Sequence, residues 1–237
     1  MKRQYFLFDL DGTLLPIDFD IFLKKYFKAL TREFLDLASP EEFIKILMKS
    51  TEDMINNDGQ KVNRVVFEES FFKLLEVNNP EEIMARFDKF YRERFPYLGE
   101  GLEVDNTSCK IIEMLKKKGY GLVLATNPVF PPEAIRERLS WSGLKADDFD
   151  FITHYNNMHY CKPNLKYYKE ILKNIGATPS RCYMVGNDVE EDMVAGRLGI
   201  KTYLIKDNLI ERGNSTIPEP DWQGSLAGLF EYLKLNS

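Results

Sequence analysis

The sequence has few of the features that mark secreted, membrane-spanning or nucleic-acid-binding proteins. Its 237 residues include three cysteines and two histidines. The cysteines are widely spaced and form no Cys-x-x-Cys pair, which indicates a reducing compartment rather than a disulfide framework. The first apolar run is interrupted by Asp9 and Asp11, too early for the core of a signal peptide. The other apolar runs are far shorter than the roughly 20 residues of a membrane span.

The charge balance lacks the basic excess of a nucleic-acid-binding protein. Lysine and arginine number 32 against 37 aspartates and glutamates, a formal net charge of −5. Hydrophobic residues make up 44% of the chain and aromatic residues 13%, as in ordinary globular proteins. We therefore predict a cytoplasmic globular protein, a monomer or homodimer, with no nucleic-acid or membrane partner.

Residues 18–97 are predicted to form a helical insertion. Residues 5–9 form a short apolar run typical of a strand buried on both faces. From residue 18 to residue 97, apolar residues recur at helical spacing, and Ser39-Pro40 and Asn79-Pro80 are typical helix starts. Four consecutive helices with short connections predict a helical bundle.

In the remainder of the chain, short apolar runs typical of strands alternate with segments that have helical spacing. Strands are predicted at 121–126, 182–185 and 201–205, with a short further segment at 151–153. Helices are predicted at 107–118, 131–141, 164–175, 189–198 and 225–235. This alternation predicts an α/β fold with a Rossmann-like parallel sheet. The α/β core would comprise residues 1–17 and 98–237, and the all-helical, four-helix cap would comprise residues 18–97.

Polar residues follow the predicted strands, at the sheet edge where ligands of parallel sheets bind. They are Asp9, Asp11, Thr126, Asn127, Lys162, Asn187, Asp188 and Asp192. Taken singly, each has an ordinary explanation, since Asp-Gly is a common turn and aspartate a common helix cap. Several carboxylates brought together would repel one another unless a cation joined them. Oxygen ligands of this kind suit Mg²⁺.

Two other kinds of site are disfavoured. His154, His159 and Cys161 lie close in sequence, but without a partner cluster an ordinary loop explains them better than a metal site. The sequence contains no Gly-x-x-x-x-Gly-Lys-[Ser/Thr] loop, which argues against a P-loop ATPase or kinase.

The ordered motifs resemble those of the haloacid dehalogenase-like (HAD) superfamily. They are Asp9-Leu-Asp11-Gly12-Thr13 after an apolar strand, then Thr126, then Lys162, then Gly186-Asn-Asp188-x-x-x-Asp192. The helical insertion resembles the cap domain of that family. The resemblance covers nearly the whole chain, and the four motifs in order are far more specific than any one of them.

The resemblance implies roles for the two N-terminal acids. Asp9 would attack phosphorus and form an aspartyl-phosphate. Asp11 would protonate the leaving oxygen and then activate the water that hydrolyses the intermediate. Mg²⁺ would be held by the Asp9 carboxylate, the Asp11 backbone carbonyl and Asp188. Splitting hydrolysis into two displacements makes each step easier.

The later motifs would bind the phosphate and support the metal. Thr126 and the backbone N–H of Asn127 would bind phosphate oxygens, and Lys162 would neutralise the transferring group. Asp188 and Asp192, four apart at a predicted helix start, would share a face, so one could hold the metal and the other orient water or Lys162. Asn187 occupies a position where the family often has an acid, so either Asp188 or Asn187 takes the metal position. We favour Asp188, because an anion binds Mg²⁺ better than an amide does.

The resulting hypothesis is a Mg²⁺-dependent phosphatase that acts on a small phosphorylated metabolite. A dehalogenating member would not be expected to carry Asp11. A phosphosugar mutase, which returns the phosphoryl group to an alcohol, and a phosphonate hydrolase, which would use a cap lysine, remain as alternatives on the same scaffold. None of the cap lysines is singled out by the sequence. A binding module without turnover is unsupported, because every expected acid is present.

Overall fold

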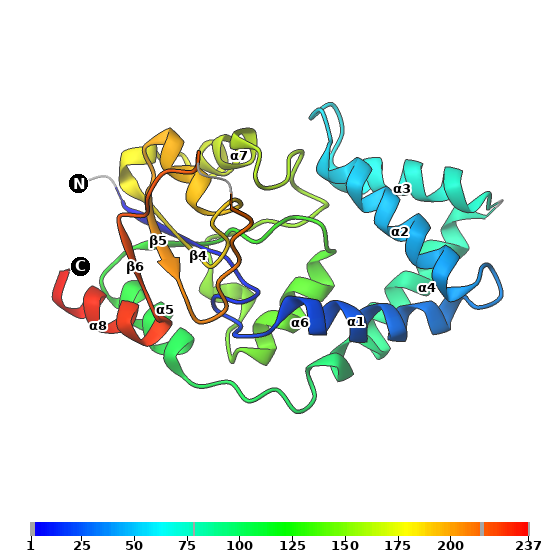
Figure 1. Cartoon of the computed structure of the whole chain (residues 1–237), viewed down its shortest axis with the longest axis horizontal. Coiled ribbons are helices and arrows are strands. Elements are labelled where there is room, and N and C mark those ends of the chain that lie inside the picture. Colours follow the sequence, from blue (N-terminus) through cyan, green and yellow to red (C-terminus); the bar gives the residue numbers. More distant parts are fainter. Residues whose placement is uncertain (1–2, 78, 214–215, 237) are drawn as a thin grey trace.

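A six-stranded sheet forms the centre of the α/β part of the computed structural model, which describes residues 3–77, 79–213 and 216–236 (Figure 1). The strands are β1 (Tyr5–Phe8), β2 (Gly121–Leu124), β3 (Phe151–Ile152), β4 (Cys182–Gly186), β5 (Lys201–Ile205) and β6 (Trp222–Gly224). Their order is β3-β2-β1-β4-β5-β6, and every neighbouring pair is parallel. The predicted Rossmann-like parallel sheet is confirmed. The sequence pattern missed β6, whose three residues are too few to show a periodicity.

Helices cover both faces of the sheet. Those of the core are α5 (Thr107–Lys117), α6 (Pro132–Trp141), α7 (Leu165–Ile175) and α8 (Leu226–Asn236). Phe6 of β1 belongs to a hydrophobic core that includes Ile112 of α5. Its neighbour Leu7 belongs to a second core that includes Tyr167 of α7. Because successive side chains of a strand point to opposite faces, β1 requires apolar residues throughout, as its sequence shows.

The segment after β4 differs from the prediction of a helix over residues 189–198. The chain makes turns up to Asp192 and then a 3-10 helix, Met193–Leu198. The Asp188 carboxylate accepts the backbone N–H groups of Glu190 and Glu191, and the Asp192 carboxylate accepts that of Asp188. Such local side-chain hydrogen bonds compete with the regular helical ladder, so the predicted α-helix is wrong here.

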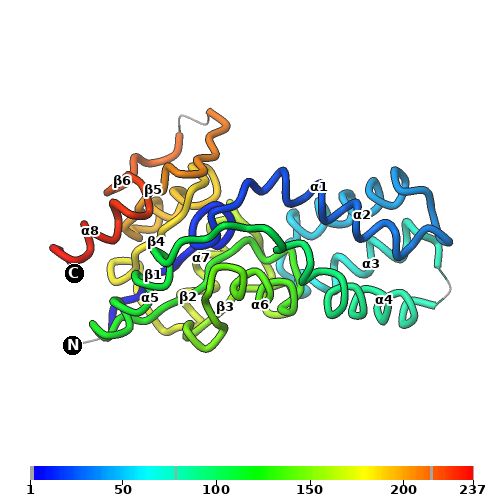
Figure 2. The backbone as a smooth tube through the Cα atoms, turned by 90° about the horizontal axis from the view of Figure 1, so that it is seen from below, coloured from blue at the N-terminus to red at the C-terminus, as the bar shows by residue number. Residues whose placement is uncertain are grey.

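Four helices inserted between β1 and β2 form the helical cap, called the cap below (Figure 2). They are α1 (Phe19–Leu30), α2 (Pro40–Ile55), α3 (Asn63–Leu75) and α4 (Pro80–Glu93). Ser39 and Asn79 cap α2 and α4 by accepting the backbone N–H groups of Glu42 and Glu82. The predicted all-helical cap is confirmed. The helical spacing of apolar residues continues to residue 37 in the sequence, whereas α1 ends at Leu30 and a 3-10 helix, Thr31–Phe34, follows it. The division at residues 17 and 97 stays a prediction.

Asn63 at the start of α3 joins the cap to the core loops. Its side chain is fully buried, and its backbone N–H donates to the Met158 carbonyl at 2.8 Å. The Asn63 side-chain amide donates to the Pro128 carbonyl at 3.3 Å and accepts from Asn57 at 3.0 Å. A buried amide with its partners satisfied holds a defined geometry. The cap is therefore fixed to the core by α3 as well as by the two chain connections.

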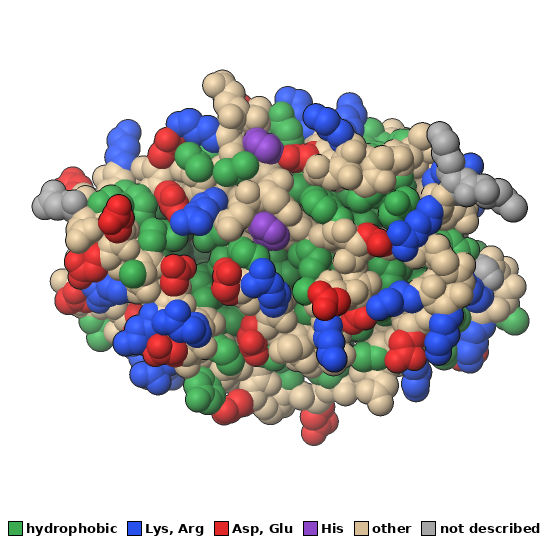
Figure 3. All heavy atoms as spheres, turned by 180° about the vertical axis from the view of Figure 1, so that it is seen from behind, with side chains coloured by type: hydrophobic (Ala, Val, Ile, Leu, Met, Phe, Trp, Pro, Cys, Tyr) green, Lys and Arg blue, Asp and Glu red, His purple; other side chains and the backbone are tan. Residues whose placement is uncertain are grey.

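Acidic and basic side chains alternate across the face shown in Figure 3. Ion pairs join Lys61 to Glu69 in the cap and Lys116 to Asp148 in the core. Mixed charge on this face agrees with the small net charge of the chain. Within the described ranges, no helix has the length and apolar character that crossing a membrane requires.

The three free cysteines are expected to differ in reactivity. Cys161 and Cys182 are buried, whereas Cys109 is half-buried. Burial raises the pKa of the Cys182 thiol to about 11, and the thiolate is the reactive form. We expect iodoacetamide at pH 7.5 to label Cys109 first and the other two only in denaturant, as measured by peptide mass spectrometry. Labelling of Cys182 in the native protein as fast as that of Cys109 would contradict the packing described here.

Candidate active site

The candidate site lies where the chain leaves β1, β2 and β4, which are adjacent in the sheet. The chain passes from β1 to β2 on one side, and β4 lies on the other side. This reversal of strand order opens a crevice at the carboxyl ends of the strands. Asp9 is tied to the sheet at this point, because its backbone N–H donates to the Val185 carbonyl at 2.8 Å. The backbone position from which the Asp9 side chain extends is therefore fixed by the sheet.

A tight turn after Asp9 places Asp11 over the same crevice. Gly12 has a φ of +80°, a left-handed conformation that favours glycine. A Cβ on this residue would lie 2.3 Å from the Asn187 side-chain nitrogen. The Thr13 hydroxyl donates to the other end of that amide at 2.9 Å. The Asp-Gly-Thr sequence thus supplies both the turn and its attachment to the loop after β4.

Lys162 forms a buried ion pair with two of the acids. Its Nζ donates to Asp9 Oδ1 at 2.7 Å and to Asp192 Oδ1 at 2.6 Å, and its side chain is 1% exposed. Burial alone would lower the pKa of Lys162, but the two carboxylates outweigh burial and raise that pKa well above its usual value. Lys162 therefore carries its positive charge beside Asp9 at neutral pH.

Asp11 is paired with Arg138, a fully buried residue of α6. The Arg138 guanidinium lies 4.4 Å from the centre of the Phe130 ring, a cation–π contact. Burial raises the pKa of the Asp11 carboxyl, although the Arg138 charge opposes that shift. Within the described structure, Asp11 Oδ1 is buried and lacks a hydrogen-bond partner. A carboxyl with a raised pKa and one free oxygen is suited to giving and taking a proton.

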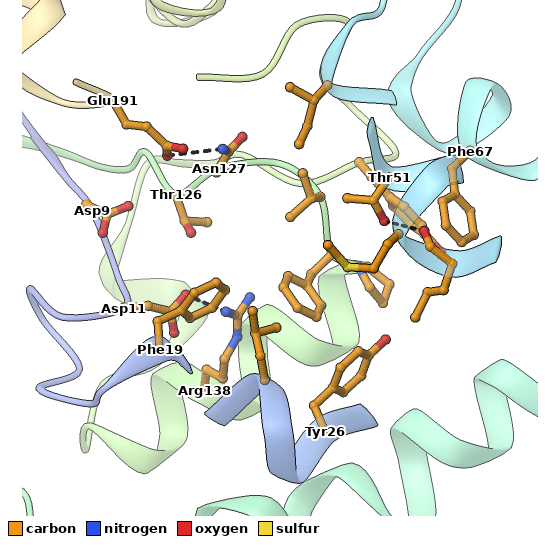
Figure 4. Close-up of a pocket in the computed structure, with 18 of the residues that line it drawn as sticks. Asp9, Asp11, Phe19, Tyr26, Thr51, Phe67, Thr126, Asn127, Arg138 and Glu191 are labelled. Atoms are coloured by element: carbon orange, nitrogen blue, oxygen red, sulfur yellow. Dashed lines mark hydrogen bonds and ion pairs between the residues drawn. The ribbon is translucent and has the colours of Figure 1, made fainter. Parts of the chain in front are cut away.

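Thr126 and Asn127 follow β2 and face the acids across the crevice. Thr126 is buried, and its carbonyl accepts from the hydroxyls of Thr153 at 2.7 Å and Tyr167 at 2.9 Å. The Asn127 amide donates to Glu191 at 3.1 Å, and its oxygen accepts the Lys162 backbone N–H at 3.3 Å. The Asn127 side chain thus ties together the loops that carry the later motifs, and Figure 4 shows Thr126 beside Asp9.

The side chains of Asn187 and Asp188 have different hydrogen-bonding partners. The Asn187 amide is used at both ends, by Thr13 at 2.9 Å and by the Asn208 carbonyl at 2.6 Å. Asp188 Oδ1 accepts two backbone N–H groups and pairs with Arg212 at 2.8 Å. Arg212 is half exposed, so it is a partner that a cation can displace more easily than a buried one.

The donor set fits a hard divalent cation held partly by water and substrate. No three His, Cys, Asp or Glu side chains in the described ranges converge tightly enough to hold a metal by themselves. Mg²⁺ typically needs only one or two carboxylates with further oxygen ligands. Asp9, Asp11 and Asp188 line one cavity. Within the described residues, the buried Asp11 Oδ1 has no hydrogen-bond partner, so the cavity has room for a further positive or hydrogen-bonding group beside it. The residues present therefore fit Mg²⁺.

One cavity of about 290 Å³ joins these acids to the cap (Figure 4). Its floor includes Asp9, Asp11, Thr126 and Asp188, and its opposite side is formed by residues of all four cap helices. In Figure 4, Phe67, Thr51 and Tyr26 lie on the side away from Asp9. A reacting group at Asp9 would therefore have its remaining atoms beneath the cap.

Sequence reasoning missed four charged residues of the cavity, which are Asp88, Arg138, Glu191 and Arg212. Glu191 was the only one inside a recognised motif, between Asp188 and Asp192. Burial raises the pKa of Glu191 to about 6, which is unusual for a glutamate in a loop. Arg138 gave no signal, because one arginine in an amphipathic helix normally faces water.

The structure assigns the histidine-bearing loop an ordinary role. His159 Nδ1 pairs with Glu170 of α7 at 2.6 Å, and the His159 backbone N–H donates to the same carboxylate at 3.0 Å. Cys161 accepts from the Asn63 amide at 3.3 Å. These contacts attach the loop to α7 and to the cap, in agreement with the expectation of a structural loop.

The fold and the site together define an α/β enzyme with acidic groups at the carboxyl edge of a parallel sheet, beneath a helical cap. The model of the haloacid dehalogenase-like hydrolases matches residues 4–199. The chain belongs to this family and is a hydrolase, so the resemblance seen in its motifs is confirmed.

The sequence identity to individual relatives is below 30%. The chain is 28% identical over 211 residues to the glyceraldehyde 3-phosphate phosphatase of Methanothermobacter thermautotrophicus, covering 86% of each chain. It is 24% identical over 224 residues to the pyrophosphatase PpaX of Bacillus cereus, covering 94% of this chain and 92% of that protein.

Solved structures share the whole fold. A HAD phosphatase from Thermococcus onnurineus matches with a TM-score of 0.59 at 21% identity, covering 98% of both chains. A 2-haloacid dehalogenase from Pseudomonas syringae pv. Tomato DC3000 matches with a TM-score of 0.67 at 19% identity, covering both chains completely. At these identities the likeness shows the fold.

Proposed function

We propose that this chain is a phosphatase that hydrolyses phosphate monoesters of a small alcohol through an aspartyl-phosphate formed on Asp9. The observation that carries the proposal is the placement of Asp9 and Asp11 on one cavity, with Lys162 fixed on Asp9 at 2.7 Å. Two relatives are named for phosphate compounds, pyrophosphate and glyceraldehyde 3-phosphate, which supports phosphoryl chemistry. The Asp11 carboxyl supports it further, since a dehalogenase has no leaving oxygen to protonate.

In the first step, the Asp9 oxygen that does not contact Lys162 attacks phosphorus. The bond between phosphorus and the alcohol oxygen breaks, and Asp11 transfers its proton to that oxygen. Thr126 and the backbone N–H of Asn127 hold the phosphate oxygens. Lys162 offsets the negative charge that two anions bring together, and a preorganised cation of this kind is most effective in a buried site.

In the second step, Asp11, now a carboxylate, takes a proton from a water molecule. The oxygen of that water attacks phosphorus, the bond to Asp9 breaks, and inorganic phosphate leaves. Asp9 is restored as a carboxylate and Asp11 as an acid. Burial raises the pKa of the Asp11 carboxyl, which favours the protonated form that the first step requires and the return of the proton in the second.

The Asp9 carboxylate, the Asp11 backbone carbonyl and Asp188 would hold Mg²⁺. When bound, Mg²⁺ supplies positive charge to the phosphoryl group. Asp188 is preferred over Asn187 for this role, because both ends of the Asn187 amide are already hydrogen-bonded. Asp192 would act on the opposite side, holding Lys162 in position.

The two alternative reactions differ in what the structure offers them. A phosphonate hydrolase would need a cap lysine in the cavity, and the described residues that line the cavity include no lysine. A phosphosugar mutase would share Asp9 and Asp11, so the product distinguishes it. Isomerised sugar phosphate instead of inorganic phosphate would favour the mutase.

Removal of the metal tests the proposal directly. We expect excess EDTA to lower phosphate release from small phosphate esters by about 100-fold or more, because Asp9 then meets an anion without sufficient positive charge. Added Mg²⁺ is expected to restore the activity, measured as inorganic phosphate released over time. Full activity in excess chelator would contradict this metal assignment.

A further inference from the structure

The cavity has two chemically different sides, and their contrast points to the class of substrate. We infer that the alcohol part of the phosphate ester is an apolar group, such as an alicyclic or branched hydrocarbon, rather than a sugar or a second phosphate. This inference rests on the proposed phosphatase function and adds the identity of the leaving group. It is carried by the side chains that the cap places above Asp9 and Asp11.

All four cap helices contribute apolar side chains to the cavity. The cap side, called the roof below, includes Leu23 and Phe27 of α1, Met48 of α2, Phe67 of α3 and Met84 of α4. An alcohol bound to a phosphate at Asp9 would lie against these groups. Burial of apolar surface against them is favourable.

The hydroxyl groups that the cap helices contribute to the roof are hydrogen-bonded within the protein. The hydroxyls of Tyr26 and Tyr91 are hydrogen-bonded to each other at 2.8 Å. The Thr51 hydroxyl donates to the Leu47 carbonyl at 2.9 Å. A sugar hydroxyl placed against the apolar side chains of the roof would exchange its hydrogen bonds with water for contacts with hydrocarbon, at a substantial cost.

Charge in the cavity also disfavours a polyanion. Asp88 of α4 is a charged residue that the cap contributes to the lining, and it would repel a second phosphate. The cations of the cavity are paired with acids, Arg138 with Asp11 and Arg212 with Asp188. They are therefore positioned toward the reacting end of the cavity rather than toward the roof.

Two esters of the same shape test the inference. Cyclohexylmethyl phosphate and glucose 6-phosphate are both phosphate esters of a primary alcohol on a six-membered ring, and they differ in the ring oxygen and hydroxyls. With Mg²⁺ present, we expect kcat/KM for cyclohexylmethyl phosphate to exceed that for glucose 6-phosphate by about tenfold or more. We expect the same order against pyrophosphate and glyceraldehyde 3-phosphate.

A third ester separates failure of the inference from failure of the proposed function. Methyl phosphate has too small an alcohol part to contact the roof. If none of the five compounds releases phosphate, the phosphatase assignment itself fails, and the inference fails with it. If phosphate is released but glucose 6-phosphate, pyrophosphate or glyceraldehyde 3-phosphate equals or exceeds cyclohexylmethyl phosphate, the inference alone is overturned.

A pair of variants in α1 ties the preference to the roof. Leu23 lines the cavity, whereas Ile21 is 53% exposed and lies outside the lining. Leu23→Asn is expected to reduce the ratio of the two kcat/KM values, cyclohexylmethyl over glucose ester, by about fivefold or more. Ile21→Asn makes the same chemical change on the same helix and is expected to leave the ratio unchanged. An equal ratio in Leu23→Asn and in the wild type would show that the roof does not select the substrate.

Discussion

Replacement of Asp9 with asparagine is expected to lower kcat by at least about 10⁴-fold while leaving the protein folded. An amide is a far weaker nucleophile than a carboxylate, so the aspartyl-phosphate would not form. Stability should change little, because Lys162 keeps Asp192 as its partner at 2.6 Å and the amide oxygen can still accept its hydrogen bond. The measurement is phosphate release under saturating Mg²⁺, together with circular dichroism and a thermal melt.

Asp147→Asn provides the matched control. Asp147 is an exposed residue of the same α/β core, in the 3-10 helix Ala146–Asp148, and its replacement removes the same charge away from the cavity. We expect this variant to keep wild-type activity. Turnover by Asp9→Asn at more than a few per cent of the wild-type rate would mean that another group attacks phosphorus, and the mechanism proposed here would have to be abandoned.

The second large effect is expected in stability, on replacement of Lys162 with methionine. The change leaves the carboxylates of Asp9 and Asp192 buried without their shared cation. Removing one partner of a buried ion pair typically costs about 3–5 kcal/mol, and here two acids lose it. For a chain of this length, that cost corresponds to a lowering of Tm by about 6–20 °C.

Lys169→Met is the control for the second prediction, since Lys169 lies on the exposed side of α7. Its Tm should stay within about 2 °C of the wild-type value. The experiment is best done at pH 7, where Lys162 is fully charged because its pKa is raised well above the usual value. With that sign of shift, the contribution of Lys162 is lost only as the pH rises through its pKa in the folded protein. An unchanged Tm in Lys162→Met would show that the two acids are not held together by this lysine.

Much of the fold follows from local sequence patterns. The strand at Tyr5–Phe8 was predictable because a run of apolar residues long enough for a strand and too short for a helix fits a sheet buried on both sides. The starts of α2 and α4 were predictable because Ser39-Pro40 and Asn79-Pro80 supply both a capping side chain and a proline at the first position. The 3-10 helix after Asp192 was not predictable, because it depends on which carboxylate accepts which N–H.

Some features of the candidate site also follow from local sequence, whereas others depend on the tertiary structure. The spacing of Asp9 and Asp11, the glycine after them and the order of the motifs are properties of the sequence, since each depends on residues close together in the chain. The pairing of Lys162 with residues 153 and 30 positions away depends on the order of the strands. The burial of Arg138 beside Asp11 depends on where α6 packs.

The sequence by itself therefore determined the class of the protein and which acids are candidates for its reaction, because strand-end position and residue type are local. Only the tertiary structure decided which ions pair, which groups lose contact with water and which side chains of the cap face the cavity. The cap sequence is amphipathic throughout, and its apolar residues serve equally as bundle core or as cavity lining. Which of them line the cavity depends on the angles at which four helices pack over the sheet, and those angles are set by contacts between distant parts of the chain.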